Sequence, residues 1–122
     1  MATILIVDDS NLSRKTSRRI LENGGHQVRD VADGLAALEQ YTLDRPDLVL
    51  LDVTMADMNG LEVLQQLRAI DPDARVVMAT ADVQNSTRDL AIAGGAAGFV
   101  TKPLNADELL AAVAGALEGA FK

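Results

Sequence analysis

The sequence has no cysteine and no tryptophan, and it contains one tyrosine and two phenylalanines. Without cysteine there can be no disulfide framework, no thiol nucleophile and no thiolate metal site. The scarcity of aromatic side chains removes the base-stacking platforms that many single-strand binders use. The net charge of −7 also opposes binding to polyanions. We therefore expect no nucleic acid partner and a core built from Leu, Val, Ile and Ala.

Long apolar runs are also missing, and no run approaches the roughly 20 residues needed to span a bilayer. Residues 1–7 lack the basic flank and the long apolar stretch of a secretory signal. We expect a cytoplasmic protein that does not associate with membranes. The length of 122 residues, with 48% hydrophobic residues, fits one domain over residues 1–122 and leaves no room for a second.

Short apolar runs alternate along the chain with longer segments of helical period, which favours a parallel sheet covered by helices. The expected strands are residues 3–7, 27–31, 48–51, 75–79 and 97–101. The expected helices run from Leu12 to Gly24-Gly25, from Leu35 to Arg45-Pro46, from Leu61 to the residue before Asp71, from about Ser86 to Gly94-Gly95, and onward from the cap Asn105. The pattern predicts a flavodoxin-like (βα)5 fold: a doubly wound, five-stranded parallel sheet of order 2-1-3-4-5 with helices on both faces.

In such sheets, ligands bind beyond the carboxyl ends of the strands at the point where the strand order reverses. The residues that follow the expected strands at this edge are Asp8, Asp9, Asp52, Thr80 and Lys102. A single Asp after a strand is often only a turn former. Three neighbouring carboxylates, however, repel by roughly 4 kcal/mol per pair at 4 Å with an effective dielectric near 20, and protonation or a cation must relieve this. Mg²⁺ fits carboxylate ligands best, and Mn²⁺ could replace it.

Asp52 is the central carboxylate of this group and a competent nucleophile towards phosphorus once charge on the transferring oxygens is neutralised. Mg²⁺ and Lys102 can neutralise that charge from two sides. Phosphoryl transfer depends on positioning and electrostatics, so the lack of a His, Cys or Ser nucleophile at this edge is no objection. The product would be an acyl phosphate on Asp52.

Four short motifs, Val7-Asp8-Asp9, Leu51-Asp52, Thr80-Ala81 and Lys102-Pro103, resemble in order and spacing the signature of CheY-like response-regulator receiver domains of two-component signalling. The resemblance covers essentially the whole chain. It implies that a histidine kinase or a histidine phosphotransfer domain phosphorylates Asp52. It also implies that Asp8, Asp9, Asp52 and the carbonyl of Thr54 hold Mg²⁺, that Thr80, Ala81 and Lys102 bind the phosphoryl group, and that the Lys102-Pro103 bond is cis.

The resemblance further implies a switch in which Phe99 moves inward when the Thr80 hydroxyl is drawn towards the phosphate. The helix around 86–93, the strand 97–101 and the last helix would report the change to an output protein that the sequence does not identify. Such a chain would be a phosphoacceptor and not an enzyme, apart from self-phosphorylation from small donors and self-dephosphorylation. It would be a stand-alone receiver, as in chemotaxis or phosphorelays, or one cut from a longer protein.

The sequence departs from the family pattern after the phosphorylation site, where Met55 is followed by Ala56 instead of Pro. Asn59-Gly60 stands where Asp-Gly is frequent, and Phe99 replaces the frequent Tyr, so a hydroxyl-dependent switch is lost. Thr54 and Asp82 would flank the path of a water that attacks the phosphoryl group. We predict that these two residues set the lifetime of the phosphorylated state.

Other readings stay open at this point. A degenerate receiver could bind partners without phosphorylation. A flavin or nucleotide enzyme is disfavoured because the turn after Val7 lacks a glycine fingerprint, and a dehalogenase-type phosphatase because no second Asp stands two residues after Asp52. The basic cluster Arg14, Lys15, Arg18 and Arg19 is either a solvated helix face, with Arg18 paired to Glu22, or a docking site for an acidic phosphodonor. His26 is interpreted as a loop residue.

Overall fold

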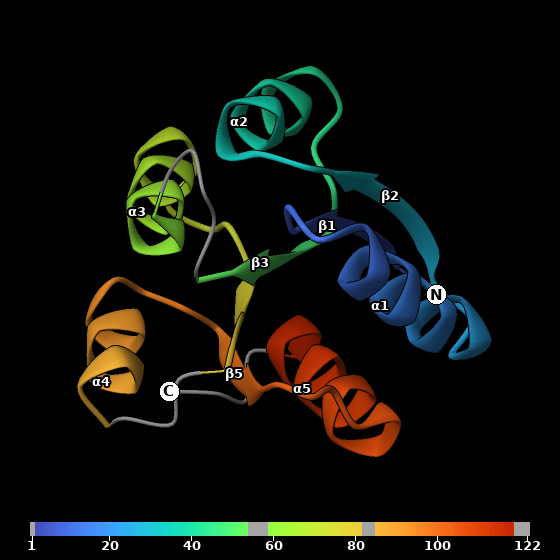
Figure 1. The fold of residues 1–122 in the computed structure, drawn as a ribbon. Coiled ribbons are helices and arrows are strands. Elements are labelled where there is room, and N and C mark those ends of the chain that lie inside the picture. Colours follow the sequence, from blue (N-terminus) through green and yellow to red (C-terminus); the bar gives the residue numbers. More distant parts are fainter. Residues whose placement is uncertain (1, 54–58, 82–84, 119–122) are drawn as a thin grey trace.

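The chain folds into a parallel five-stranded sheet with helices on both faces (Figure 1). The structure is a computed structural model that describes residues 2–53, 59–81 and 85–118. The strands are β1 (Thr3–Val7), β2 (Gln27–Val31), β3 (Leu48–Asp52), β4 (Val76–Thr80) and β5 (Gly98–Thr101). The helices are α1 (Asn11–Asn23), α2 (Gly34–Leu43), α3 (Gly60–Ile70), α4 (Asn85–Ala93) and α5 (Ala106–Glu118). The strand order is β2-β1-β3-β4-β5, so the predicted fold class is confirmed.

Two apolar layers separate the sheet from its helices. Helices α1 and α5 cover one face, where Leu21, Leu109 and Val113 pack on β1, β3 and β4. Helices α2, α3 and α4 cover the other face, where Tyr41 and Leu64 belong to the second layer (Figure 1). The central strands β3 and β4 are buried along their whole length, which explains their continuous apolar sequence. No helix within the described ranges is long and apolar enough to cross a membrane.

The ends of the helices follow from local hydrogen bonding. Ser10 caps α1 by accepting a hydrogen bond from the Ser13 amide at 3.2 Å, and Asn105 caps α5 by accepting one from the Glu108 amide at 3.1 Å. Gly25 and Gly95 follow α1 and α4 with φ angles of +90° and +92°, a conformation that favours glycine. His26, expected in a loop, accepts a hydrogen bond through Nδ1 from the Ala2 amide at 3.2 Å.

Strands β3 and β4 each end one residue later than the sequence predicts. Asp52 is the last residue of β3, paired with Ala79, and Thr80 is the last residue of β4, paired with Thr101. The Val53 amide still donates to the Ala79 carbonyl at 2.9 Å. Backbone pairing continues through these polar residues because the ladder bonds do not depend on side-chain type. Asp52 and Thr80 are therefore held by the sheet itself and not by a loop.

Candidate functional site

The acidic cluster predicted at the carboxyl edge of the sheet is present. Asp8 and Asp9 follow β1, and Asp52 ends the adjacent strand β3. One carboxylate oxygen from each of the three residues lies within 4.8 Å of the other two. Asp8 and Asp52 are buried, with 4% and 6% of their surface exposed, whereas Asp9 is exposed. Three oxygens this close, with one side open to solvent, suit a hard cation with several water ligands.

Lys102 reaches this cluster from the residue after β5. Its Nζ lies 2.9 Å from Oδ2 of Asp8 and 3.5 Å from Oδ1 of Asp52. The Lys102 amide donates to the Thr80 carbonyl at 2.7 Å, and the bond from Lys102 to Pro103 is cis. One ammonium group therefore lies against two of the three carboxylates, and the cluster keeps an excess of negative charge that a divalent cation would offset.

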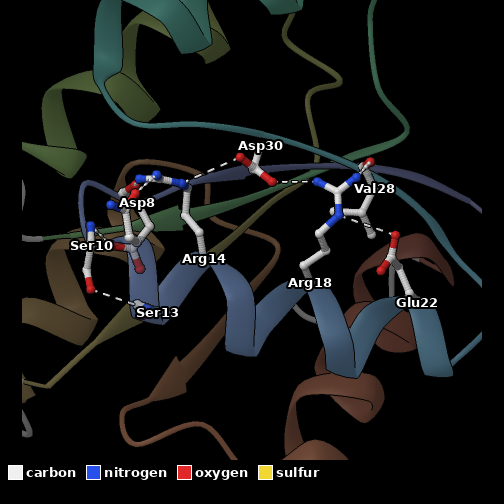
Figure 2. Close-up of polar contacts among 9 residues, drawn as sticks. Asp8, Ser10, Ser13, Arg14, Arg18, Glu22, Val28 and Asp30 are labelled. Carbon is white, nitrogen blue, oxygen red and sulfur yellow. Dashed lines mark hydrogen bonds and ion pairs between the residues drawn. The ribbon is translucent and has the colours of Figure 1, made fainter.

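The carboxylate, the amide and the carbonyl of Asp8 each make a hydrogen bond to the surrounding chain. Its Oδ1 accepts a hydrogen bond from the Ser10 amide at 2.9 Å, and its own amide donates to the Val31 carbonyl at 3.2 Å. Its carbonyl oxygen accepts from Nη1 of Arg14 at 2.7 Å. Figure 2 shows the Arg14 side chain extended from α1 towards this carbonyl. The position of the Asp8 carboxylate is thus fixed before any ligand arrives.

The remaining residues of the predicted site lie around Asp52. Thr80 is buried and directly follows Ala79, the ladder partner of Asp52, while Ala81 is exposed. Phe99 is half-buried against the layer that α2, α3 and α4 cover. A side chain on Gly60 would place its Cβ 2.3 Å from the carbonyl oxygen of Asp52, so the glycine is required by space.

Some predicted residues fall where the structure gives no description. Thr54 and Asp82, predicted to set the phosphorylated lifetime, lie outside the described residues, as do Met55 and Ala56. Their roles stay predictions.

The interpretation of the basic cluster on α1 as a solvated face is wrong for Arg14. Only 16% of its side chain is exposed, and its Nε lies 3.5 Å from Oδ1 of Asp30 on β2. Arg18 also binds Asp30 and donates to the Val28 carbonyl at 2.9 Å (Figure 2). The predicted pair of Arg18 with Glu22 is confirmed at 3.3 Å. Lys15 and Arg19 are exposed, as expected of a solvated face.

Sequence reasoning missed Asp30 as the partner of both arginines. The sequence did hold a signal for this contact. Asp30 lies on β2, which pairs with β1, and α1 connects these two strands and packs against β2. A charged residue on that strand, facing the basic side of the connecting helix, is a natural ion-pair partner.

Comparison with known proteins identifies the family. A family model for the response regulator receiver domain matches residues 4–114. The chain belongs to this receiver domain family. Among curated relatives of the receiver domain, the chemotaxis protein CheY of Bacillus subtilis is 40% identical over 111 residues, which cover 90% of this chain and 92% of that protein. The response regulator MprA of Mycobacterium ulcerans is 41% identical over 108 residues, or 88% of this chain and 47% of that longer protein.

Solved structures agree with this receiver assignment. The chemotaxis protein CheY4 of Vibrio cholerae has a TM-score of 0.88 and 31% identity, over 93% of this chain and 97% of that one. A LuxR-family two-component response regulator from Aurantimonas sp. has a TM-score of 0.92 and 32% identity, over 98% and 86%. The receiver family is one of signalling switches in two-component systems, which disfavours the flavin, nucleotide and dehalogenase alternatives.

Proposed function

We propose that this receiver domain accepts a phosphoryl group on Asp52 from a histidine kinase or a histidine phosphotransfer domain, in the presence of Mg²⁺, and signals by changing conformation. The observation that supports this most directly is the position of Asp52. Its buried carboxylate lies in a cluster with those of Asp8 and Asp9 and 3.5 Å from Nζ of Lys102. A nucleophile, a metal-binding acidic pair and a cation for the phosphoryl oxygens thus lie at one edge of the sheet.

The donor set fits Mg²⁺, and Mn²⁺ by the same oxygen chemistry. Asp8, Asp9 and Asp52 would each contribute one carboxylate oxygen, and the carbonyl of Thr54 would add another ligand. A bound divalent ion would neutralise charge on the phosphoryl oxygens during transfer. Because Asp9 is exposed, the site is open to water and to an incoming phosphoryl group.

In the transfer step, a carboxylate oxygen of Asp52 forms a bond to phosphorus while the bond from phosphorus to the donor imidazole nitrogen breaks. The electron pair of the broken bond stays on that nitrogen, and an acyl phosphate forms on Asp52. Lys102 would pair with one phosphoryl oxygen. The Thr80 hydroxyl and the Ala81 amide would donate to others, because Thr80 ends β4, the strand next to that of Asp52, and Ala81 follows it.

Signal output would start from Thr80. If its hydroxyl is drawn to the phosphoryl group, Phe99 can pack more deeply, which would alter the surface formed by α4, β5 and α5. On α4, the apolar side chains of Leu90 and Ile92 are 58% and 40% exposed. An output protein would bind there, in chemotaxis or a phosphorelay, and residues 1–122 would act as one receiver unit.

The test is incubation with Mg²⁺ and acetyl phosphate, followed by intact mass measurement. We expect one phosphoryl adduct on the parent and none on Asp52→Asn. Asp73→Asn, a change at an exposed position remote from the carboxyl edge, is the matched control and should keep the adduct. A parent without an adduct would support the degenerate receiver, and an adduct that survives Asp52→Asn would place the modification elsewhere; either result would overturn the proposal.

A further inference from the structure

Arg14 joins three parts of the molecule at the edge of the metal-binding cluster. From α1, its guanidinium donates to the Asp8 carbonyl at 2.7 Å and to the side chain of Asn11, and its Nε lies 3.5 Å from Asp30 of β2. Figure 2 shows the guanidinium between Asp8 and Asp30. The proposed phosphoryl chemistry makes no use of this arrangement.

The carbonyl that Arg14 binds belongs to the peptide group between Asp8 and Asp9. The atoms of a peptide group lie in one plane, so fixing its oxygen also fixes the direction in which the Asp9 Cα leaves Asp8. The preceding peptide is fixed as well, because the Asp8 amide donates to the Val31 carbonyl at 3.2 Å. Hydrogen bonds thus hold the peptide groups on both sides of the Asp8 Cα, and Arg14 supplies the one that also involves Asp9.

Arg18 offers a direct internal comparison. It lies one helical turn after Arg14 and binds the same Asp30, but it also binds Glu22 and the Val28 carbonyl. Its side chain is 39% exposed, against 16% for Arg14. The two arginines thus share a partner and a helix face, and they differ in that Arg14 contacts a residue of the acidic cluster.

We propose that Arg14 is a positioning residue of the metal site, whose guanidinium holds the Asp8–Asp9 peptide in the orientation that lets both carboxylates bind one cation. Asp30 holds the guanidinium in place in turn. The inference rests on the proposed metal-dependent function and adds a residue to it that does not itself touch the metal. Residues that orient metal ligands in this way commonly affect metal affinity strongly.

Charge and position predict opposite effects for Arg14, which makes the inference testable. As a nearby positive charge, Arg14 repels Mg²⁺, so removing the charge alone would tighten binding. As a positioning group, it favours binding, and both removal of the side chain and its replacement by Lys would weaken binding. Lys keeps the charge, but its single ammonium group cannot reproduce the planar fork that spans Asp8 and Asp30.

The experiment is isothermal titration calorimetry with MgCl₂ on the parent, Arg14→Lys, Arg14→Met and Arg18→Met. We expect both Arg14 variants to raise the Kd for Mg²⁺ by about tenfold or more. Arg18→Met should bind close to the parent, which controls for loss of a pair with Asp30. Unchanged affinity in Arg14→Lys, or tighter binding in Arg14→Met, would overturn the inference.

A second measurement separates this inference from the proposed function. Phosphorylation by acetyl phosphate, followed across Mg²⁺ concentrations, should need more Mg²⁺ in Arg14→Lys but reach the parent's maximum rate at saturation. If the parent binds Mg²⁺ with the expected differences but forms no adduct on Asp52, the proposed function fails and the role of Arg14 stands. If the parent does not bind Mg²⁺, both fail. Circular dichroism confirms that each variant is folded, and the Lys variant keeps the test valid if the Met variant unfolds.

Discussion

Carboxylates at the two ends of the sheet have different surroundings. At the amino end, the carboxylate of Asp71, the residue after α3, contacts three neighbouring groups. The Tyr41 hydroxyl donates to its Oδ2 at 2.8 Å, the Asp73 amide donates to its Oδ1 at 3.0 Å, and Arg45 pairs with it at 3.3 Å. These contacts, the Tyr41 hydrogen bond first among them, hold the pKa of Asp71 below its ordinary value.

At the carboxyl end, Asp8, Asp9 and Asp52 crowd together, and the Lys102 ammonium faces two of them. One carboxylate with three donors at the amino end contrasts with three carboxylates near one ammonium at the carboxyl end. The contrast shows that residue type does not decide the role of an acid. A single carboxylate that accepts from neighbouring donors stabilises the fold, whereas three carboxylates within 4.8 Å of one another favour binding of a cation.

Glycines differ between the two ends as well, and their substitution should give the largest effect. Gly60→Ala at the carboxyl end would place its Cβ 2.3 Å from the carbonyl oxygen of Asp52. This oxygen belongs to the backbone and cannot move away as the end of a flexible side chain could. We expect it to lower the free energy of unfolding by about 3 kcal/mol in urea denaturation.

The control lies at the amino end, where Gly25 has a φ of +90° and open space around it. Gly25→Asn should cost much less, because Asn accepts this conformation and meets no neighbour. Equal losses for the two variants would show that packing beneath the acidic cluster is not tighter than elsewhere.

Mg²⁺ should stabilise the parent through the carboxyl end alone. At a concentration of 100 times its Kd, binding adds about 2.7 kcal/mol to the free energy of unfolding. Asp9→Asn should lose most of this gain, since it replaces one of the three clustered carboxylates by a neutral amide, whereas Asp71→Asn should keep it. Urea denaturation with Mg²⁺ and with EDTA measures both. A gain retained in Asp9→Asn would locate the ion elsewhere.

Sequence patterns predicted the strand order and therefore the meeting of Asp8, Asp9, Asp52 and Lys102. This was possible because one rule fixes the geometry: in a parallel sheet all carboxyl ends share one edge. Contacts that depend on the exact register and on side-chain length were not predicted. The contact of Arg14 with the Asp8 carbonyl needs the rotation of α1 against β1, and the contact of Tyr41 with Asp71 joins residues 30 positions apart. Helical spacing alone indicates which face is apolar, not which polar atom a long side chain reaches.

Removal of one acid from the cluster should stabilise the metal-free protein. Asp52→Asn keeps the shape of the side chain and removes one negative charge from a cluster of three carboxylates. We expect a gain of about 2 kcal/mol in EDTA, half of the repulsion estimated for a pair at 4 Å. Urea denaturation in EDTA measures it, and the gain should disappear when Mg²⁺ is added. A loss of stability in EDTA would mean that the cluster is already compensated.

The smallest effect on stability is expected from substitution of Tyr41 at the amino end. This effect tests the hydrogen bond between the Tyr41 hydroxyl and the Asp71 carboxylate. Burial, and then the hydrogen bond to Asp71, raises the pKa of Tyr41 from 10.0 to about 12. Below pH 10 both folded and unfolded chains hold the phenolic proton, so this stabilisation is complete there. Between about pH 10 and 12 the unfolded chain loses the proton first, and the stabilisation fades as the pH rises.

Phenolate absorbance measures this pKa directly, because Tyr41 is the single tyrosine and the chain has no tryptophan. Tyr41→Phe should cost about 1 kcal/mol at neutral pH, the usual net contribution of one hydrogen bond. Asp71→Asn should lower the pKa of Tyr41 only part of the way, since burial of the ring remains as the larger cause. A Tyr41 that titrates normally in the parent would mean that its hydroxyl is not held by Asp71. The contrast between the two ends of the sheet would then rest only on the crowding of three carboxylates at the carboxyl end.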